Sequence, residues 1–110
     1  LRPVFDYAAL AEVPVTANLN VRRMHGVIDR LIITDADVQV IDFKTNATVP
    51  GSAQACPAGL LRQMGAYAQA LSQIYPNHEI RTAILWTRTA ELLWLPHDLV
   101  TQALSRTQIS

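Results

Sequence analysis

The chain has 110 residues, half of them hydrophobic, and a formal net charge of zero from nine basic and nine acidic residues. This fits a single globular domain, 1–110, and excludes a disordered chain, while the lack of a basic excess counts weakly against an autonomous nucleic-acid binder. The single cysteine, Cys56, excludes an internal disulfide and any iron–sulfur or zinc site built on cysteines alone, and no apolar run approaches the ~18 residues of a membrane span.

The first half of the chain predicts mostly β structure. Residues 1–11 are ambiguous, and their alanine-rich end indicates the end of a helix or a connection. Strands are predicted at 12–19, 21–33 and 38–44. Pro14 favours a sheet edge for the first strand. The short polar break at 34–37 predicts a hairpin between the second and third strands.

The second half predicts helices and strands in alternation. A loop at 46–59 precedes a helix at about 60–75, which ends at Pro76. Its predicted buried stripe is Leu60, Met64, Tyr67, Leu71 and Ile74. Two strands at 79–87 and 91–95 precede a helix at 98–106, which is expected to pack Leu99, Val100, Ala103 and Leu104. This order predicts an α/β domain with a mixed β-sheet flanked by helices.

The hairpin register brings two carboxylates together. A loop that is symmetric about Asp35 and Ala36 places Asp29 directly opposite Asp42, with Cβ atoms ~4.5–5.5 Å apart. A three-residue loop would shift the register by one residue and separate them. Lys44 is two residues beyond Asp42, so its side chain points to the same face.

Folding alone does not favour this arrangement. The neighbours expected on that face are apolar, namely Val27, Leu31, Val38 and Val40. Like charges directly opposite one another are destabilising, and a charge in apolar surroundings needs a partner. An Mg²⁺ ion bound by the carboxylates would resolve the conflict, and Lys44 could then act on a water or on developing phosphorane charge. The alternative is a salt bridge from Lys44 to one aspartate, which leaves the other without a partner.

Three short motifs resemble a known nuclease family. They are Gly26-Val27-Ile28-Asp29-Arg30, Asp42-Phe43-Lys44-Thr45 and Gln63-Met64-Gly65-Ala66-Tyr67. Their order resembles the G-x-x-D-R, D-x-K and Q-x-x-x-Y series of RecB-type nucleases in the PD-(D/E)XK superfamily, and most of all the C-terminal nuclease domain of bacterial AddA helicase–nuclease subunits. The resemblance covers roughly 12–95 and implies a restriction-endonuclease-like fold.

The resemblance implies a role for each matching residue. Asp29 and Asp42 would bind Mg²⁺ or Mn²⁺, with the backbone carbonyl of Phe43 as a further ligand. Lys44 would be the catalytic lysine.

Gln63 and Tyr67 would be auxiliary residues beside the site, because four residues on a helix place them on one face. Gln63 would contact the lysine region or DNA. A plain core position for Tyr67 and a solvated position for Gln63 remain open. Arg30 would contact either DNA or a nearby carboxylate or carbonyl.

The family pattern includes a further acidic or His position on a helix that would precede Leu1. Glu12 could substitute for this acidic or His residue. The residues His25, His78 and His97 are not spaced as metal ligands. The chain is therefore expected to be a truncated fragment of a larger helicase–nuclease, and the isolated fragment could be inactive.

The implied function is Mg²⁺-dependent hydrolysis of DNA phosphodiester bonds during double-strand-break end processing in the bacterial cytoplasm. The implied partners are DNA and an AddB-like second subunit, with ATP used only by the missing helicase part and no membrane. Two alternatives are a non-catalytic nuclease-fold scaffold or docking module and a metal hydrolase of small phosphate esters.

Overall fold

A computed structural model of the chain describes residues 8–19, 22–46 and 49–109. Within these residues, the predicted order of three strands, a helix, two strands and a helix is confirmed. The elements are β1 (Ala8–Leu19), β2 (Arg22–Ile33), β3 (Asp37–Lys44), the short 3₁₀ helix η2 (Ala53–Ala55), α1 (Ala58–Ile74), β4 (Glu79–Trp86), β5 (Glu91–Leu95) and α2 (His97–Ile109). The alanine-rich segment before residue 12 belongs to β1, so its assignment to a helix end was wrong.

The strands form one mixed sheet in the order β1-β2-β3-β4-β5. β3 and β4 are parallel, and the other neighbouring pairs are antiparallel. A parallel pair needs a crossover connection, which α1 provides. β1 is an edge strand, as Pro14 predicted, because an edge tolerates the missing N–H of proline.

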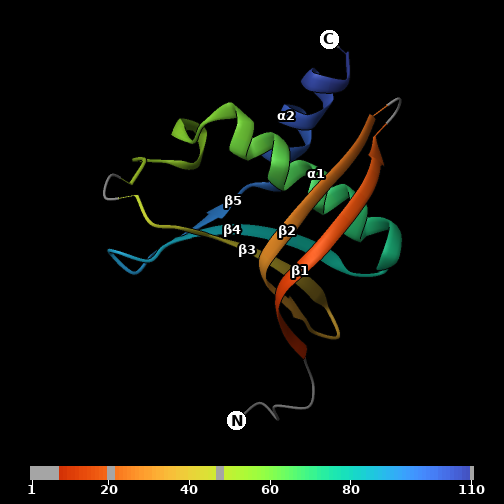
Figure 1. The fold of residues 1–110 in the computed structure, drawn as a ribbon, viewed down its shortest axis with the longest axis horizontal. Coiled ribbons are helices and arrows are strands. Elements are labelled where there is room, and N and C mark those ends of the chain that lie inside the picture. Colours follow the sequence, from red (N-terminus) through yellow and green to blue (C-terminus); the bar gives the residue numbers. More distant parts are fainter. Residues whose placement is uncertain (1–7, 20–21, 47–48, 110) are drawn as a thin grey trace.

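Both helices lie on the same side of the sheet, and α2 packs against α1 (Figure 1). Contacts on more than one side bury eight of the 17 residues of α1, among them Met64, which is 0% exposed, and Leu61, which is 6% exposed. Ile74, predicted as part of the buried stripe, is 66% exposed. The two helices meet closely at Gly65, where an added Cβ would collide with the carbonyl oxygen of Val100. No helix in the described part of the chain is both long and apolar enough to cross a bilayer.

β2 changes face part-way along its length. Ile28 and Leu31 are three residues apart, so a regular strand would point them to opposite faces, yet both are buried. The change falls at Asp29, where the β1–β2 pairing is interrupted at Glu12, a non-glycine residue with a φ of 54°. Figure 1 shows the β1–β2 hairpin curving out of line with β3 and rising beside α1. The irregular stretch of β2 therefore includes a predicted site residue.

Candidate active site

The hairpin register is the predicted one. β2 and β3 pair from Ile33 opposite Val38 to Arg30 opposite Ile41. The next position of the same register places Asp29 opposite Asp42, and there the backbone ladder stops. The two aspartates therefore lie where β2 separates from β3.

Asp29 has a backbone partner at this opening. Its Oδ2 accepts a hydrogen bond from the N–H of Phe43 at 2.8 Å. This N–H lies just past the end of the β2–β3 ladder, and the side chain of Asp29 replaces the missing backbone acceptor. The expectation that a salt bridge would leave one aspartate without a partner was therefore wrong.

Asp42 is the buried member of the pair. It is 8% exposed, on the same face of β3 as the fully buried Val38 and Val40. Leu31 is also buried, as predicted, but Val27 is 51% exposed because β2 has changed face. The apolar strip beside the carboxylates is therefore confirmed except at Val27.

Lys44 is the ion-pair partner of Asp42. Its Nζ lies 3.1 Å from Asp42 Oδ2, and the lysine side chain is 37% exposed. The contact does not have standard hydrogen-bond geometry, and among the described residues this buried oxygen has no hydrogen-bond partner. Burial raises the pKa of Asp42, Lys44 lowers it, and Asp29 raises it again, with a net increase. The structure thus holds Asp42 where its charged form is disfavoured.

Gln63 and Tyr67 connect α1 to the strand that carries Asp29. The Gln63 amide donates to the Tyr67 hydroxyl at 3.0 Å, and that hydroxyl donates to the carbonyl oxygen of Val27 at 3.3 Å. Burial raises the pKa of Tyr67, and the negative charges of Asp42 and Asp29 raise it further. Tyr67 is therefore both a core residue, 1% exposed, and within electrostatic reach of the two carboxylates.

The Tyr67 side chain packs against Gly26. An added Cβ at Gly26 would collide with the Tyr67 hydroxyl and would lie 2.9 Å from ring atom Cε1. The glycine of the first motif is thus favoured where the Tyr67 side chain crosses β2. The sequence motif includes this glycine without indicating a physical reason for it, because the contact joins two motifs that are distant in the chain.

The remaining candidates lie outside this cluster. Arg30 is exposed, and its guanidinium lies 5.9 Å from the centre of the Phe43 ring, so its described contact is with an aromatic face. The imidazole Nε2 of His78 lies 3.0 Å from the Thr34 carbonyl oxygen. Glu12 is exposed, and no three His, Cys, Asp or Glu side chains gather as a metal site within 8–19, 22–46 and 49–109. The site therefore offers two carboxylates.

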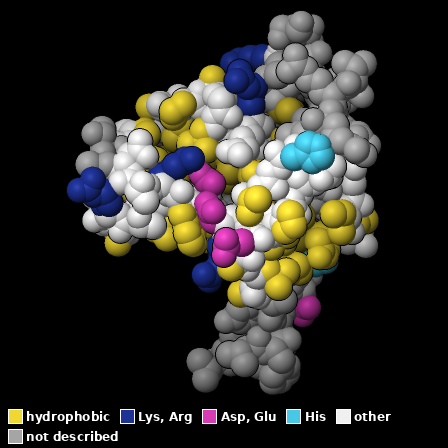
Figure 2. Space-filling model, viewed as in Figure 1, with side chains coloured by type: hydrophobic (Ala, Val, Ile, Leu, Met, Phe, Trp, Pro, Cys, Tyr) yellow, Lys and Arg dark blue, Asp and Glu magenta, His cyan; other side chains and the backbone are white. Residues whose placement is uncertain are grey.

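Figure 2 shows the surface on the side from which Figure 1 is viewed. Acidic side chains gather near the middle of this face, with a basic side chain beside them and hydrophobic side chains around them. The two types of charge are thus exposed together on this face.

The sequence profile of the PD-(D/E)XK nuclease superfamily matches residues 2–104. The chain belongs to this superfamily. The fold agrees, because the solved structure titled "Crystal structure of SSO0001" superposes with a TM-score of 0.50 at 14% sequence identity. The match covers 92% of this chain and 49% of the solved one, so the chain spans about half the length of that structure. Comparison with curated proteins gives no significant match.

The paired aspartates and the lysine can be compared with the residue types for which the PD-(D/E)XK superfamily is named. The superfamily is named for an acidic pair and a lysine, and Asp42-Phe43-Lys44 on β3 has the residue types and spacing of the second part of that name. Asp29 reaches the same place from β2. Phosphodiester hydrolysis is the activity that this membership implies.

Proposed function

We propose that the chain is a divalent-metal-dependent deoxyribonuclease domain whose active site consists of Asp29, Asp42 and Lys44. The observation that carries the proposal is the opening of the β2–β3 ladder at Asp29 and Asp42, with Lys44 Nζ 3.1 Å from Asp42. A scaffold gains nothing from a buried carboxylate whose pKa is raised by desolvation and by a second carboxylate. Groups with perturbed pKa values in such places are typical of catalytic sites.

The residues at the opening fit a hard divalent cation. Mg²⁺ prefers carboxylate and carbonyl oxygens, and it is commonly held by one or two carboxylates together with substrate phosphate. Asp42 Oδ2 is a buried oxygen that lacks a hydrogen bond among the described residues. Asp29 and Asp42 would therefore hold Mg²⁺ or Mn²⁺, which when bound lowers the pKa of water and polarises a phosphoryl oxygen.

The Phe43 carbonyl is the third proposed ligand. The N–H of Phe43 points to Asp29, and in a strand the N–H and C=O of one residue point to the same neighbour. The carbonyl is thus directed to the opened side of β3. The hydrogen bond from the Phe43 N–H fixes Asp29 on that side as well.

Lys44 would act on the substrate rather than on the fold. Its side chain is partly exposed, so the ammonium can reach a phosphate while it remains next to Asp42. In that position it holds the attacking water or stabilises the negative charge that develops on the phosphoryl oxygens. Gln63 and Tyr67 would be auxiliary, because their hydrogen bonds fix β2 at Val27, two residues before Asp29.

The finer assignment rests on the sequence motifs. The G-x-x-D-R, D-x-K and Q-x-x-x-Y series supports a RecB-type nuclease similar to the AddA domain, in a larger bacterial protein that pairs with an AddB-like subunit and processes double-strand breaks. In that setting ATP is used by a helicase part, and the product of this domain is a trimmed DNA end.

A non-catalytic scaffold is the second candidate, and one observation favours it. The Lys44–Asp42 ion pair and the hydrogen bond from Phe43 to Asp29 already provide both aspartates with a partner among the described residues. A scaffold requires neither carboxylate for activity, whereas the nuclease requires both.

Cleavage of an end-labelled linear DNA duplex separates the two candidates. We expect Mg²⁺-dependent cleavage by the wild type and a loss of at least about 10²-fold in Asp42→Asn, the range typical of removing one group that stabilises a transition state. Asp35→Asn is the matched control, because Asp35 is an exposed aspartate in the turn at the other end of the hairpin. Equal rates in Asp42→Asn and the wild type would rule out the assigned site.

A further inference from the structure

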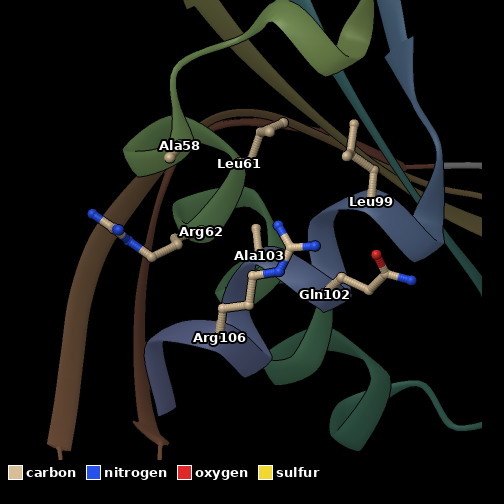
Figure 3. A pocket seen from close by; sticks show the side chains of 7 residues that line it. All are labelled: Ala58, Leu61, Arg62, Leu99, Gln102, Ala103 and Arg106. Carbon is tan, nitrogen blue, oxygen red and sulfur yellow. The ribbon is translucent and has the colours of Figure 1, made fainter. Parts of the chain in front are cut away.

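A pocket lies between the two helices, away from the paired aspartates. It has a volume of about 320 Å³ and is open to solvent. Leu61 from α1 and Leu99 and Ala103 from α2 form its apolar part, and Figure 3 shows where these side chains lie on the two helices. The pocket is therefore a built feature of the α1–α2 contact.

The charged residues that line the pocket are both cationic. They are Arg62 and Arg106, which are exposed, and the described lining residues include no acidic one. The first turn of α1 also contains no acidic residue, and its N-cap, Pro57, gives no side-chain cap. Ala58, in that first turn, lines the pocket. Because a helix N-terminus carries partial positive charge, the helix end and the arginines favour the same kind of ligand.

The two arginines do not converge on one point. In Figure 3, Arg106 reaches from α2 back toward α1, whereas Arg62 extends from α1 in a different direction. This spread suits a chain of anions better than a single small anion. An apolar area between two cations also suits a sugar-phosphate strand, whose charged groups are separated by sugars and bases.

The pocket shares a helix with the candidate active site. Arg62 is next to Gln63 in the chain, and Gln63 is hydrogen bonded to Tyr67. Tyr67 lies five positions after Arg62, which is ~7.5 Å along a helix axis at ~1.5 Å per residue. One strand of a duplex carries a phosphate every ~3.4 Å of axis, so a few nucleotides cover this length.

We propose that the pocket between α1 and α2 binds the phosphate backbone of a nucleic-acid strand, with Arg62 and Arg106 each contacting a phosphate. The inference rests on the proposed nuclease function. It names the part of the molecule that binds the substrate at phosphates other than the one that is cleaved. It also gives a chain with no net charge a way to bind a polyanion, through two arginines that line one pocket.

The test is DNA binding without cleavage. The affinity of the wild-type chain for a fluorescently labelled 20-base-pair duplex is measured by anisotropy in EDTA at several salt concentrations. Neutralising one phosphate contact changes the slope of log K against log salt by about 0.9. We expect Arg62→Gln and Arg106→Gln each to weaken binding and to reduce that slope by about one, and the double variant by about two.

Arg81→Gln is the matched control for loss of one positive charge. Arg81 lies on β4 between the buried Ile80 and Thr82, so it faces away from α1, and it stacks on Trp94 at 4.2 Å. Arg62→Lys tests charge against structure, because it keeps the cation and should keep most of the slope. Urea denaturation of each variant separates loss of binding from loss of folding.

The outcomes distinguish the two proposals. If wild type binds and the double variant binds with the same affinity and slope, the pocket proposal is overturned while the nuclease proposal stands. If the wild type does not bind the duplex at all, the pocket proposal is overturned. Duplex DNA is then also ruled out as the substrate of the proposed nuclease. A selective loss in Arg62→Gln and Arg106→Gln, absent in Arg81→Gln, supports the pocket.

Discussion

The carboxylate of Asp29 accepts a hydrogen bond from the backbone N–H of Phe43 across the point where β2 leaves β3, at 2.8 Å. A side chain thus occupies the position that a strand carbonyl would take in a continuous ladder. The interaction adds to the parallel pairing with β4, which continues along β3 as far as Lys44. It also fixes Asp29 beside Asp42, so the opened ladder defines the geometry of the candidate site.

The first prediction concerns the cost of burying Asp42. Its pKa is raised, so the folded protein favours the protonated form, and the stability associated with that form is lost as pH rises through the folded-state pKa. We expect Asp42→Asn to be more stable than the wild type at pH 7, by about 0.5–1 kcal/mol. The difference should shrink as the pH is lowered through the pKa of Asp42. Thermal unfolding followed by circular dichroism between pH 3 and pH 8 measures it.

Asp37 provides the opposite case on the same strand. Burial alone would raise its pKa, but hydrogen bonds with Thr34 and Gln39 and the charge of Arg81 bring it below the usual value. Its stabilising contribution is present above the unfolded pKa and is lost as pH falls through the folded one. Asp37→Asn should therefore destabilise the protein at pH 7. If both variants changed stability in the same direction, the electrostatic description of Asp42 would be wrong.

The second prediction concerns Gly26. Adding a methyl group there forces the Tyr67 side chain to move, because the new Cβ would collide with its hydroxyl. We expect Gly26→Ala to lower the free energy of unfolding by about 1–3 kcal/mol, the usual cost of overpacking. Gly51→Ala is the control, since an added Cβ there has no neighbour within 4 Å. Urea denaturation measures both.

A double-mutant cycle tests whether the Gly26 effect runs through Tyr67. In a Tyr67→Phe background the colliding hydroxyl is absent, so Gly26→Ala should cost less than it does in the wild type. Tyr67→Phe alone should cost about 1 kcal/mol, because it removes the hydrogen bonds to Gln63 and Val27. Strict additivity of the two substitutions would show that Gly26 matters for another reason.

The third prediction separates Lys44 from the proposed metal ligands. Lys44→Ala should abolish DNA cleavage and leave the fold intact, because the lysine side chain is partly exposed. It should retain Mn²⁺ binding, since Lys44 is not a ligand and its removal takes a positive charge away from Asp42. A variant that cleaves DNA at the wild-type rate would exclude Lys44 from the catalytic site.

Most of the fold could be predicted from local patterns. A loop that is symmetric about Asp35 and Ala36 predicts the hairpin register and places Asp29 opposite Asp42, whereas a three-residue loop would not. Element order follows from periodicity and from the positions of proline and glycine. These features are local, so a single sequence contains them.

The features that escaped prediction depend on tertiary contacts. Val27 was expected on the buried face, but β2 changes face near Asp29, so Ile28 is buried in its place. Periodicity alone cannot indicate such a change. Ile74 fits the helical stripe of α1 but lies at the end of the helix, where it is 66% exposed. The demand for glycine at position 26 arises from Tyr67, which lies 41 residues further along the chain and packs against it only in the folded protein.

The most direct test of the central claim is titration of the chain with Mn²⁺ by isothermal calorimetry, with the wild type, Asp29→Asn, Asp42→Asn and Asp35→Asn compared. If Asp29 and Asp42 jointly hold a divalent cation, the wild type and Asp35→Asn bind Mn²⁺, and both site variants lose binding. Mn²⁺ binding by Asp42→Asn with wild-type affinity, or no binding by the wild type, would contradict the account.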